Sequence, residues 1–227
     1  MSEAEKNQLI INHLLQFVSE KRQETMERVL SQRTRHVTLV LEDIFQSQNS
    51  SAAVRTCECL GIQDIHFIER QSHYSVNKKV LKGSNKWLDL IKYKEKNVNN
   101  TERCYQNLKA NGYQILVTDP SPDGISINDV PIDKKIALVM GNELEGISEY
   151  ALTHADQKVN IPMFGFTESF NISVSAAICL NILLSKVRKL NAWQLNDDQK
   201  QTIRLQWLRK TVRASHLIEA EFLRSID

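Results

Sequence analysis

Three short polar segments carry the residues of this chain that could do chemistry. They are residues 49–55 (Asn-Ser-Ser-Ala-Ala-Val-Arg), residues 140–148 (Met-Gly-Asn-Glu-Leu-Glu-Gly-Ile-Ser) and residues 161–174 (Ile-Pro-Met-Phe-Gly-Phe-Thr-Glu-Ser-Phe-Asn-Ile-Ser-Val). Each follows an apolar run typical of a strand and leads into a predicted helix. The first turn of a helix has backbone N–H groups without partners inside the helix, and these groups bind polar or anionic ligands. We therefore expect the three segments to contribute to ligand binding.

The types of residue in these segments indicate a pocket rather than a metal site. Gly141 comes directly after the apolar run 135–140, where a missing side chain lets a ligand approach the backbone. Ile161, Met163 and Phe170 are apolar and suited to cover a flat ring such as adenine. The chain has no G-x-G-x-x-G, G-x-S-x-G or Walker A motif, so the Rossmann cofactor fingerprint is absent.

The polar residues of the same segments are candidates for catalysis. Arg55 could hold a phosphate through two parallel hydrogen bonds. We prefer this function to that of a base, because a guanidinium group keeps its proton at physiological pH. Asn171 could also simply cap the helix predicted after it. Each such residue, taken alone, is more often a turn, surface or cap residue, and only their combination indicates a site.

Strands alternate with helices along the chain. We predict strands at residues 36–42, 64–69, 113–118, 135–140 and 156–161. We predict helices within residues 4–33, from Ser50 or Ser51 to Gly61, at residues 101–110 and at residues 171–190, with a long connection containing short elements at residues 71–100. This pattern is typical of an α/β fold with a mostly parallel sheet and helices on both faces. Ligands bind such sheets at the carboxyl ends of the strands, where the three polar segments lie.

In this order and spacing the three segments resemble the signature motifs of the SpoU family, which belongs to the SPOUT superfamily of knotted RNA 2′-O-methyltransferases. The resemblance covers roughly residues 22–213, and the long third segment is its most specific part. Residues 26–33, Glu42 and the tail with Trp207 are similar to the tRNA (guanosine-2′-O-)-methyltransferase branch. The chain departs from many relatives at residues 45–48 (Phe-Gln-Ser-Gln), where they have a His-Lys-Pro-His-like run, and at Asn142.

The resemblance implies a fold, a cofactor and partners. It implies a deep trefoil knot in the C-terminal part of the sheet domain, S-adenosylmethionine (AdoMet) as methyl donor, tRNA as substrate, and a homodimer in which Arg55 acts near the partner's cofactor. The implied catalytic residues are Asn49, Arg55, Glu143, Ser169 and Asn171. The implied cofactor-binding residues are Thr118, Met140, Gly141, Gly146, Ile161, Met163, Ser169, Phe170 and Asn171. The implied reaction is methylation of the 2′-OH of guanosine 18 in the tRNA D-loop; the alternatives are another tRNA position, ribosomal RNA, or an RNA-binding module without catalytic activity.

The resemblance and the charge pattern divide the chain into three parts. We predict an N-terminal helical extension at residues 1–35, a SPOUT methyltransferase domain at 36–190 and a basic helical extension at 191–227. Residues 1–36 carry a net charge of +1 and residues 186–227 carry +4, whereas the residues between them carry −3. Basic ends fit RNA binding, although two solvated helices would explain the charge equally well. Our candidate RNA-binding residues are Arg28, Arg33, Arg55, Arg188, Arg209 and Arg213.

The composition also bears on bound metals, secretion and membrane insertion. The four cysteines form no C-x-x-C pair or other metal-ligand pattern, so we expect reduced thiols and no bound metal. The acidic, polar N-terminus is not a secretory signal, and no apolar run approaches the length needed to span a membrane. We therefore expect a cytoplasmic protein that does not enter a membrane.

Overall fold

The chain divides into two compact units. The computed structural model describes residues 2–71, 75, 77–121 and 123–226. Residues 34–193 form one unit, which contains the β-sheet and which we call the sheet unit. Residues 1–33 and 194–227 together form the other, which we call the helical unit. The extensions predicted at the two ends of the chain thus pack against each other.

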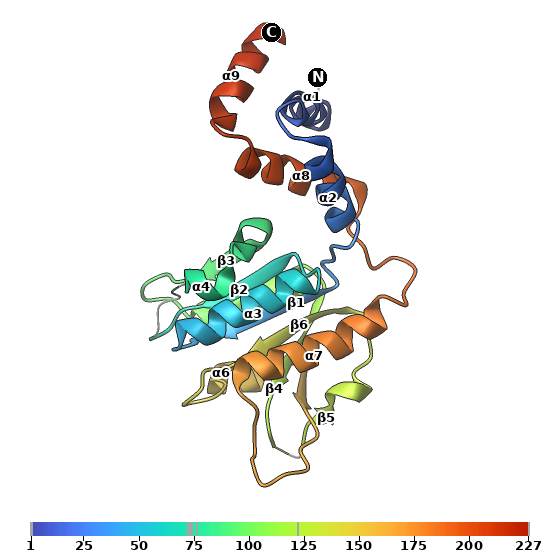
Figure 1. The fold of residues 1–227 in the computed structure, drawn as a ribbon. Coiled ribbons are helices and arrows are strands. Elements are labelled where there is room, and N and C mark those ends of the chain that lie inside the picture. Colours follow the sequence, from blue (N-terminus) through green and yellow to red (C-terminus); the bar gives the residue numbers. More distant parts are fainter. Residues whose placement is uncertain (1, 72–74, 76, 122, 227) are drawn as a thin grey trace. The chain divides into compact units, whose positions relative to one another are not determined.

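The sheet unit is built on seven strands in the order β3-β2-β1-β6-β4-β7-β5, and every pairing between neighbours is parallel (Figure 1). The strands are β1 (Val37–Glu42), β2 (Asp64–Ile68), β3 (Asp89–Tyr93), β4 (Tyr113–Thr118), β5 (Ile125–Ser126), β6 (Lys135–Met140) and β7 (Gln157–Asn160). The predicted parallel sheet is confirmed. The sequence pattern missed β5, which has only two residues, and did not resolve β3 within the predicted connection at residues 71–100, of which residues 72–74 and 76 lie outside the described part of the chain.

Burial explains why the central strands are nearly continuous apolar runs. All six residues of β1 are buried, as are the last five of β6. A parallel strand covered by helices on both faces needs apolar side chains at successive positions rather than at alternate ones. Leu39 points to one face and packs with the residues of α3 and α7, whereas Val40 points to the other and packs with Tyr105. The sheet therefore lies between two hydrophobic layers.

The helices of the sheet unit cover these two faces. They are α3 (Ser47–Cys59), α4 (Lys78–Leu81), α5 (Asn100–Ala110), α6 (Glu149–His154) and α7 (Ile172–Val187), with the 3-10 helices η1 (Ser84–Trp87) and η2 (Ile127–Asp129). Residues of α3 and α7 belong to one core cluster, and residues of α5 and α6 belong to the other. The N-cap of α3 is Gln46, four residues before Ser50, the earliest cap we predicted, so the helix begins at Ser47. This shift places Asn49 in the first turn of α3.

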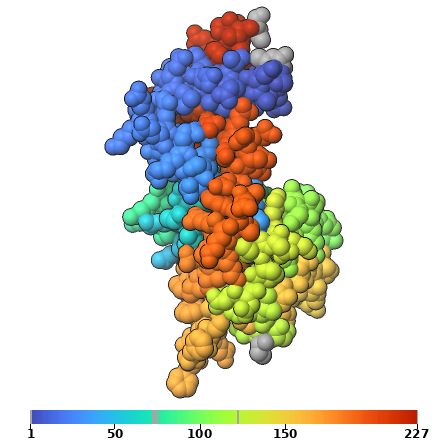
Figure 2. Space-filling model, turned by 90° about the vertical axis from the view of Figure 1, so that its right-hand side faces the viewer, coloured from blue at the N-terminus to red at the C-terminus, as the bar shows by residue number. Residues whose placement is uncertain are grey.

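The helical unit contains α1 (Glu3–Leu15), α2 (Glu20–Leu30), α8 (Asp197–Thr211) and α9 (Ser215–Ile226). Helix α1 contacts both α8 and α9, and Figure 2 shows the blue N-terminal and red C-terminal segments of this unit side by side. Capping boxes at Ser2 and Asn196 begin α1 and α8. In the described part of the chain, no helix combines the length and apolar character that crossing a bilayer requires.

Candidate active site

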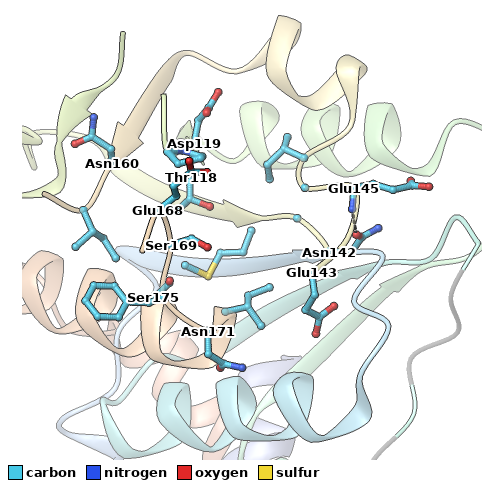
Figure 3. Close-up of a pocket in the computed structure, with 18 of the residues that line it drawn as sticks. Thr118, Asp119, Asn142, Glu143, Glu145, Asn160, Glu168, Ser169, Asn171 and Ser175 are labelled. Atoms are coloured by element: carbon cyan, nitrogen blue, oxygen red, sulfur yellow. Dashed lines mark hydrogen bonds between the residues drawn. The ribbon is translucent and has the colours of Figure 1, made fainter. Parts of the chain in front are cut away.

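The three polar segments meet at the carboxyl edge of the sheet. They follow β1, β6 and β7, as the sequence predicted, and they border a cavity of about 770 Å³ (Figure 3). All nine predicted cofactor-binding residues line this cavity, namely Thr118, Met140, Gly141, Gly146, Ile161, Met163, Ser169, Phe170 and Asn171. Loops distant in the sequence therefore form a single pocket.

The segment after β6 is a tight loop that only glycine permits at its first position. A Cβ atom on Gly141 would lie 2.1 Å from the backbone oxygen of Gly146. Asn142 and Gly146 exchange two backbone hydrogen bonds of 3.0 and 3.1 Å, and Gly146 has a φ of 71°. The Asn142 side chain accepts hydrogen bonds from the N–H groups of Leu144 and Glu145. Asn142 thus folds the loop that forms one wall of the pocket.

A chain of amide and carboxylate side chains joins the three segments at the mouth of the pocket. The Asn49 Nδ2 donates to Glu143 Oε1 at 2.6 Å. The Asn171 Nδ2 donates to Asn49 Oδ1 at 3.1 Å. The second Glu143 oxygen accepts a hydrogen bond from the backbone N–H of Phe45 at 3.3 Å. Three of the five predicted catalytic residues therefore form one network, and a fourth, Ser169, lines the same pocket.

Asn171 has a local function as well. It is the N-cap of α7, and its Oδ1 accepts hydrogen bonds from the Ser173 backbone N–H at 2.9 Å and from the Ser173 hydroxyl at 2.6 Å. Because its oxygen caps the helix, its nitrogen is free to point across to Asn49. The structure therefore confirms the predicted cap and shows that capping and site assembly use different atoms of one side chain.

A buried carboxylate outside the predicted set of site residues supports the loop after β6. Glu42, at the end of β1, is 1% exposed. It accepts hydrogen bonds from the Thr101 hydroxyl at 2.6 Å, the Ser148 hydroxyl at 2.8 Å and the Ser148 backbone N–H at 2.9 Å. A buried carboxylate needs such donors to offset its lost hydration. Glu42 thus fixes the end of the loop that begins at Gly141.

Further polar residues at the pocket were also missed. Asp119 directly follows β4 and lines the cavity together with Asn160, Glu168 and Ser175. Their position after strands β4 and β7 or near the start of α7 could have identified them, because that edge of a parallel sheet binds ligands.

Burial raises the pKa of the Cys179 thiol in α7 to about 12, so Cys179 stays protonated and belongs to the core rather than to a reactive site.

Arg55 is the predicted catalytic residue that the structure does not bring to this pocket. It is exposed on α3 and lines a separate hollow of about 620 Å³ between α3 and α7. Arg55 lies six positions after Asn49 on the same helix. Its side chain therefore points roughly 120° away from that of Asn49 around the helix axis. In its own chain Arg55 therefore faces away from the mouth of the pocket. The same hollow is lined by Ala52, Leu60, Val80, Ala177 and Ile178, among others.

The predicted RNA-binding arginines differ in their surroundings. Arg33 is completely buried in the helical unit, with its guanidinium 5.4 Å from the centre of the Trp207 ring, so the prediction that it contacts RNA is wrong for this structure. Arg209 is paired with Glu219 through two hydrogen bonds. Arg188 donates to the Leu60 carbonyl and lies over Trp193. Arg28 and Arg213 are exposed.

Comparison with known proteins finds a methylase family and several methyltransferases that are similar to this chain. The SpoU rRNA Methylase family matches residues 36–181. A tRNA (guanosine(18)-2'-O)-methyltransferase of Borreliella burgdorferi is 41% identical over 92% of this chain and 94% of its own length. The crystal structure of a TrmH/SpoU tRNA modifying enzyme from A. aeolicus superposes with a TM-score of 0.76 at 28% identity, covering 86% of this chain and 98% of its own. The AviRb methyltransferase from Streptomyces viridochromogenes in complex with AdoMet has the same fold, with a TM-score of 0.60 at 19% identity over 72% of this chain and 65% of its own.

The parallel sheet and the pocket formed by three loops at its carboxyl edge, together with these matches, define an RNA methyltransferase. Within this class, the chain belongs to the SpoU methylase family, whose match covers more than half of its residues. The trefoil knot that the resemblance implies stays a prediction.

Proposed function

We propose that this chain transfers a methyl group from AdoMet to the ribose 2′-OH of guanosine 18 in tRNA. The observation that carries the proposal is the joining of the three motifs by the hydrogen bonds of Asn49, Glu143 and Asn171 at the mouth of one pocket. The relative from Borreliella burgdorferi, which is named for this reaction, aligns with nearly the whole chain and supports the choice of substrate.

The residues of the pocket fit AdoMet. The cavity of about 770 Å³ has the size typical of small-molecule sites. Ile161, Met163 and Phe170 offer apolar surface for an adenine ring, and the loop from Gly141 to Gly146 forms part of the pocket wall. The missing side chain of Gly141 makes room for the Gly146 backbone rather than for a ligand. When bound, AdoMet supplies a methyl group on a positively charged sulfur. We assign the nine lining residues predicted from the sequence to its binding.

The network at the mouth of the pocket positions the ribose. Both oxygens of Glu143 already accept hydrogen bonds, one from Asn49 and one from the Phe45 backbone. We therefore infer that Glu143 orients Asn49, and that Asn49 and Asn171 hold the sugar. Transfer requires the hydroxyl oxygen to point at the methyl carbon, and fixed polar groups achieve this alignment before the reaction begins. Ser169 lines the pocket next to this network and completes the proposed set of polar residues in the same chain.

We further propose that the active enzyme is a homodimer in which Arg55 serves the partner's pocket. Arg55 lies outside the pocket of its own chain. Most of the residues that line the hollow beside it are apolar. An apolar groove beside a charged residue is suited to bury against a second copy of the chain. In that arrangement the Arg55 guanidinium would bind the phosphate next to the target ribose.

We place this activity in the cytoplasm, with tRNA as the partner. The structure describes all four cysteines and shows no disulfide between them, and Cys59, Cys104 and Cys179 are free thiols. Free thiols fit a reducing compartment, where disulfides are rare. The exposed Arg28 and Arg213 remain our candidates for tRNA contacts from the helical unit.

Ribosomal RNA is the second candidate substrate, because the matching family is described by rRNA methylation. Methyl transfer to a tRNA transcript, followed by mapping of 2′-O-methyl groups at single-nucleotide resolution, separates the candidates. We expect one modified position, guanosine 18, and no transfer to a transcript that carries 2′-deoxyguanosine there. Modification elsewhere in tRNA, or only in ribosomal RNA, would contradict our choice of substrate. Cofactor binding without any transfer would instead indicate an RNA-binding module.

A further inference from the structure

A lysine-rich segment lies in the sheet unit, outside the parts of the chain that the sequence indicated as basic. Residues 70–88 contain five Lys and Arg and no Asp or Glu. The remaining residues of the sheet unit contain 13 Lys and Arg against 17 Asp and Glu. The helical unit contains 11 basic and 10 acidic residues, so it is nearly neutral. Without this segment the sheet unit would carry a net charge of −4, so the positive charge of the unit depends on the segment around α4.

The charged side chains that line the pocket are negative, although one of them, Asp119, pairs with Lys158 at 3.5 Å. Four carboxylates line it, at Asp119, Glu143, Glu145 and Glu168, and no Lys or Arg is among the described residues that line it. A tRNA brings one negative charge for every phosphate, and the phosphates next to the target ribose must come close to this acidic edge. Positive side chains elsewhere must hold the RNA backbone against this repulsion.

Two lysines of α4 and a third at its C-cap lie on a segment that packs against α3, the helix that carries Arg55. Leu81 is buried and Val80 lines the same hollow as Arg55, so these two side chains attach α4 to α3. Lys78, Lys79 and Lys82 are exposed. Figure 1 shows α4 next to α3, and the two helices are in contact. The three lysines therefore belong to the segment that packs against the helix carrying the predicted phosphate-binding arginine.

Hydrogen bonds tie the start of α4 to the first turns of α3. The Asn77 backbone N–H donates to the Ser51 hydroxyl at 2.9 Å, and the Ser50 hydroxyl donates to the Ser75 carbonyl at 3.4 Å. Asn77 then caps α4 by accepting from the Lys79 N–H at 3.1 Å. Ser50 and Ser51 directly follow Asn49, so the same turn of α3 that reaches the pocket also fixes the lysine segment. These hydrogen bonds fix the start of α4 against the helix that carries Asn49 and Arg55.

We propose that Lys78, Lys79 and Lys82 form a phosphate-binding surface for the tRNA backbone that flanks the target nucleotide. The proposal rests on the proposed function, because it takes tRNA as the substrate. Each lysine offers a compact charge on a long flexible stem, which suits binding to phosphates without reading the base sequence. The surface adds binding energy and orients the RNA, and it leaves the methyl transfer step itself to the pocket.

The test compares two double variants of equal charge. Lys78→Gln with Lys79→Gln removes two charges from α4. Lys134→Gln with Lys189→Gln removes two exposed lysines outside α4, one just before β6 and one just after the end of α7. Binding of an unmodified tRNA transcript is measured at several salt concentrations, methyl transfer is measured at varied tRNA, and the binding of AdoMet alone is measured by calorimetry.

We expect the α4 variant to bind the transcript roughly tenfold more weakly at about 0.1 M salt, and the slope of log K against log salt to fall by about 1.5. Its KM for tRNA rises while kcat and AdoMet affinity stay unchanged, because the lysines do not touch the reacting atoms. The control variant keeps the slope of the wild type. Equal slopes for all three proteins, or a loss in the control as large as in the α4 variant, would overturn the proposal.

The same experiment separates this proposal from the proposed function. Salt-dependent tRNA binding is measured without methyl transfer, so the lysine surface is tested even if guanosine 18 is not the methylated position. If the wild type methylates guanosine 18 and the α4 variant binds tRNA with the wild-type slope, only the lysine proposal fails. If the slope of log K against log salt falls for the α4 variant and the wild type methylates another position, only the choice of nucleotide fails.

Discussion

Asn171 donates a hydrogen bond of 3.1 Å to the side-chain oxygen of Asn49, a residue 122 positions earlier in the chain. The second group on Asn49, its amide nitrogen, continues the connection to Glu143. One short side chain thus uses its donor and its acceptor to join two loops. Because an amide carries both kinds of group, asparagine can do this, whereas an aspartate could not donate to Glu143. The identity of Asn49 follows from its place between a donor and a carboxylate.

Removing this connection should lower activity much more than it lowers stability. We expect Asn49→Ala to reduce kcat/KM for methylation about 100-fold, because the loops that align the ribose lose their common anchor. A double-mutant cycle of Asn49→Ala and Asn171→Ala, measured by urea unfolding, should give a coupling energy of about 1 kcal/mol. Additive losses in the cycle would show that the two residues do not interact in solution.

The loop after β6 should be far more sensitive to an added methyl group than the loop after β7. In Gly141→Ala the new Cβ meets the Gly146 backbone oxygen at 2.1 Å, so the loop must move and the pocket changes shape. We expect AdoMet affinity, measured by calorimetry, to fall at least about tenfold. Gly165→Ala is the matched control, because no atom lies within 4 Å of its added Cβ. Equal effects of the two substitutions would mean that the loop is not held as the structure describes.

Some residues of the site could be predicted from the sequence, and others could not. The pocket-lining residues could be predicted because Gly141, Ile161 and Phe170 stand in motifs that follow strands, and the edge of a parallel sheet brings such motifs together. The support from Glu42 to Ser148 could not, because it joins a strand end to a loop 106 positions later by tertiary packing.

Charge was the least predictable property. Arg33 belongs to a basic segment and is nevertheless buried against Trp207, because the long stem of an arginine can pack in a core when an aromatic ring covers its charged end. The exposed lysines of α4 lie in a segment whose position relative to Arg55 only the packing of α4 on α3 reveals. Local sequence fixes whether a residue is charged, whereas the fold decides whether that charge reaches the surface.

A buried histidine in the sheet should make the protein less stable in mild acid. His66 in β2 is 4% exposed, and its Nδ1 lies 3.1 Å from the Tyr93 hydroxyl, which accepts from Asn107 and can donate to the neutral ring. Burial lowers the pKa of His66 to about 4, from an ordinary value near 6.5. The unfolded chain therefore takes up a proton below pH 6.5 that the folded chain refuses until about pH 4. Stability present above pH 6.5 is lost as the pH falls toward 4, by about 3 kcal/mol at most.

Urea unfolding at pH 7.0, 5.5 and 4.5 checks this expectation when the wild type is compared with His66→Gln. Glutamine offers an oxygen to the Tyr93 hydroxyl and does not titrate, so the variant should lose less stability than the wild type over the same range. Other groups titrate equally in both proteins, and their contribution cancels in the difference. Parallel losses would show that His66 is protonated in the folded protein or does not contribute.

The shared site can be tested by mixing Arg55→Ala with Gly141→Ala, because Arg55 lies outside the pocket of its own chain. The AdoMet concentration is kept too low to fill the distorted pocket of Gly141→Ala, so each variant alone is inactive. Arg55→Ala keeps the pocket and lacks the arginine, whereas Gly141→Ala keeps the arginine and has a distorted pocket. If Arg55 acts in the partner's pocket, a mixed dimer contains one complete site, made from the pocket of the first variant and the arginine of the second. Random exchange of subunits should then restore about a quarter of the wild-type sites. If Arg55 serves its own chain, neither subunit of the mixed dimer has a complete site, and the mixture stays inactive. Methyl transfer to tRNA, measured before and after exchange of subunits, distinguishes the two arrangements, and light scattering of each variant verifies that the dimers form.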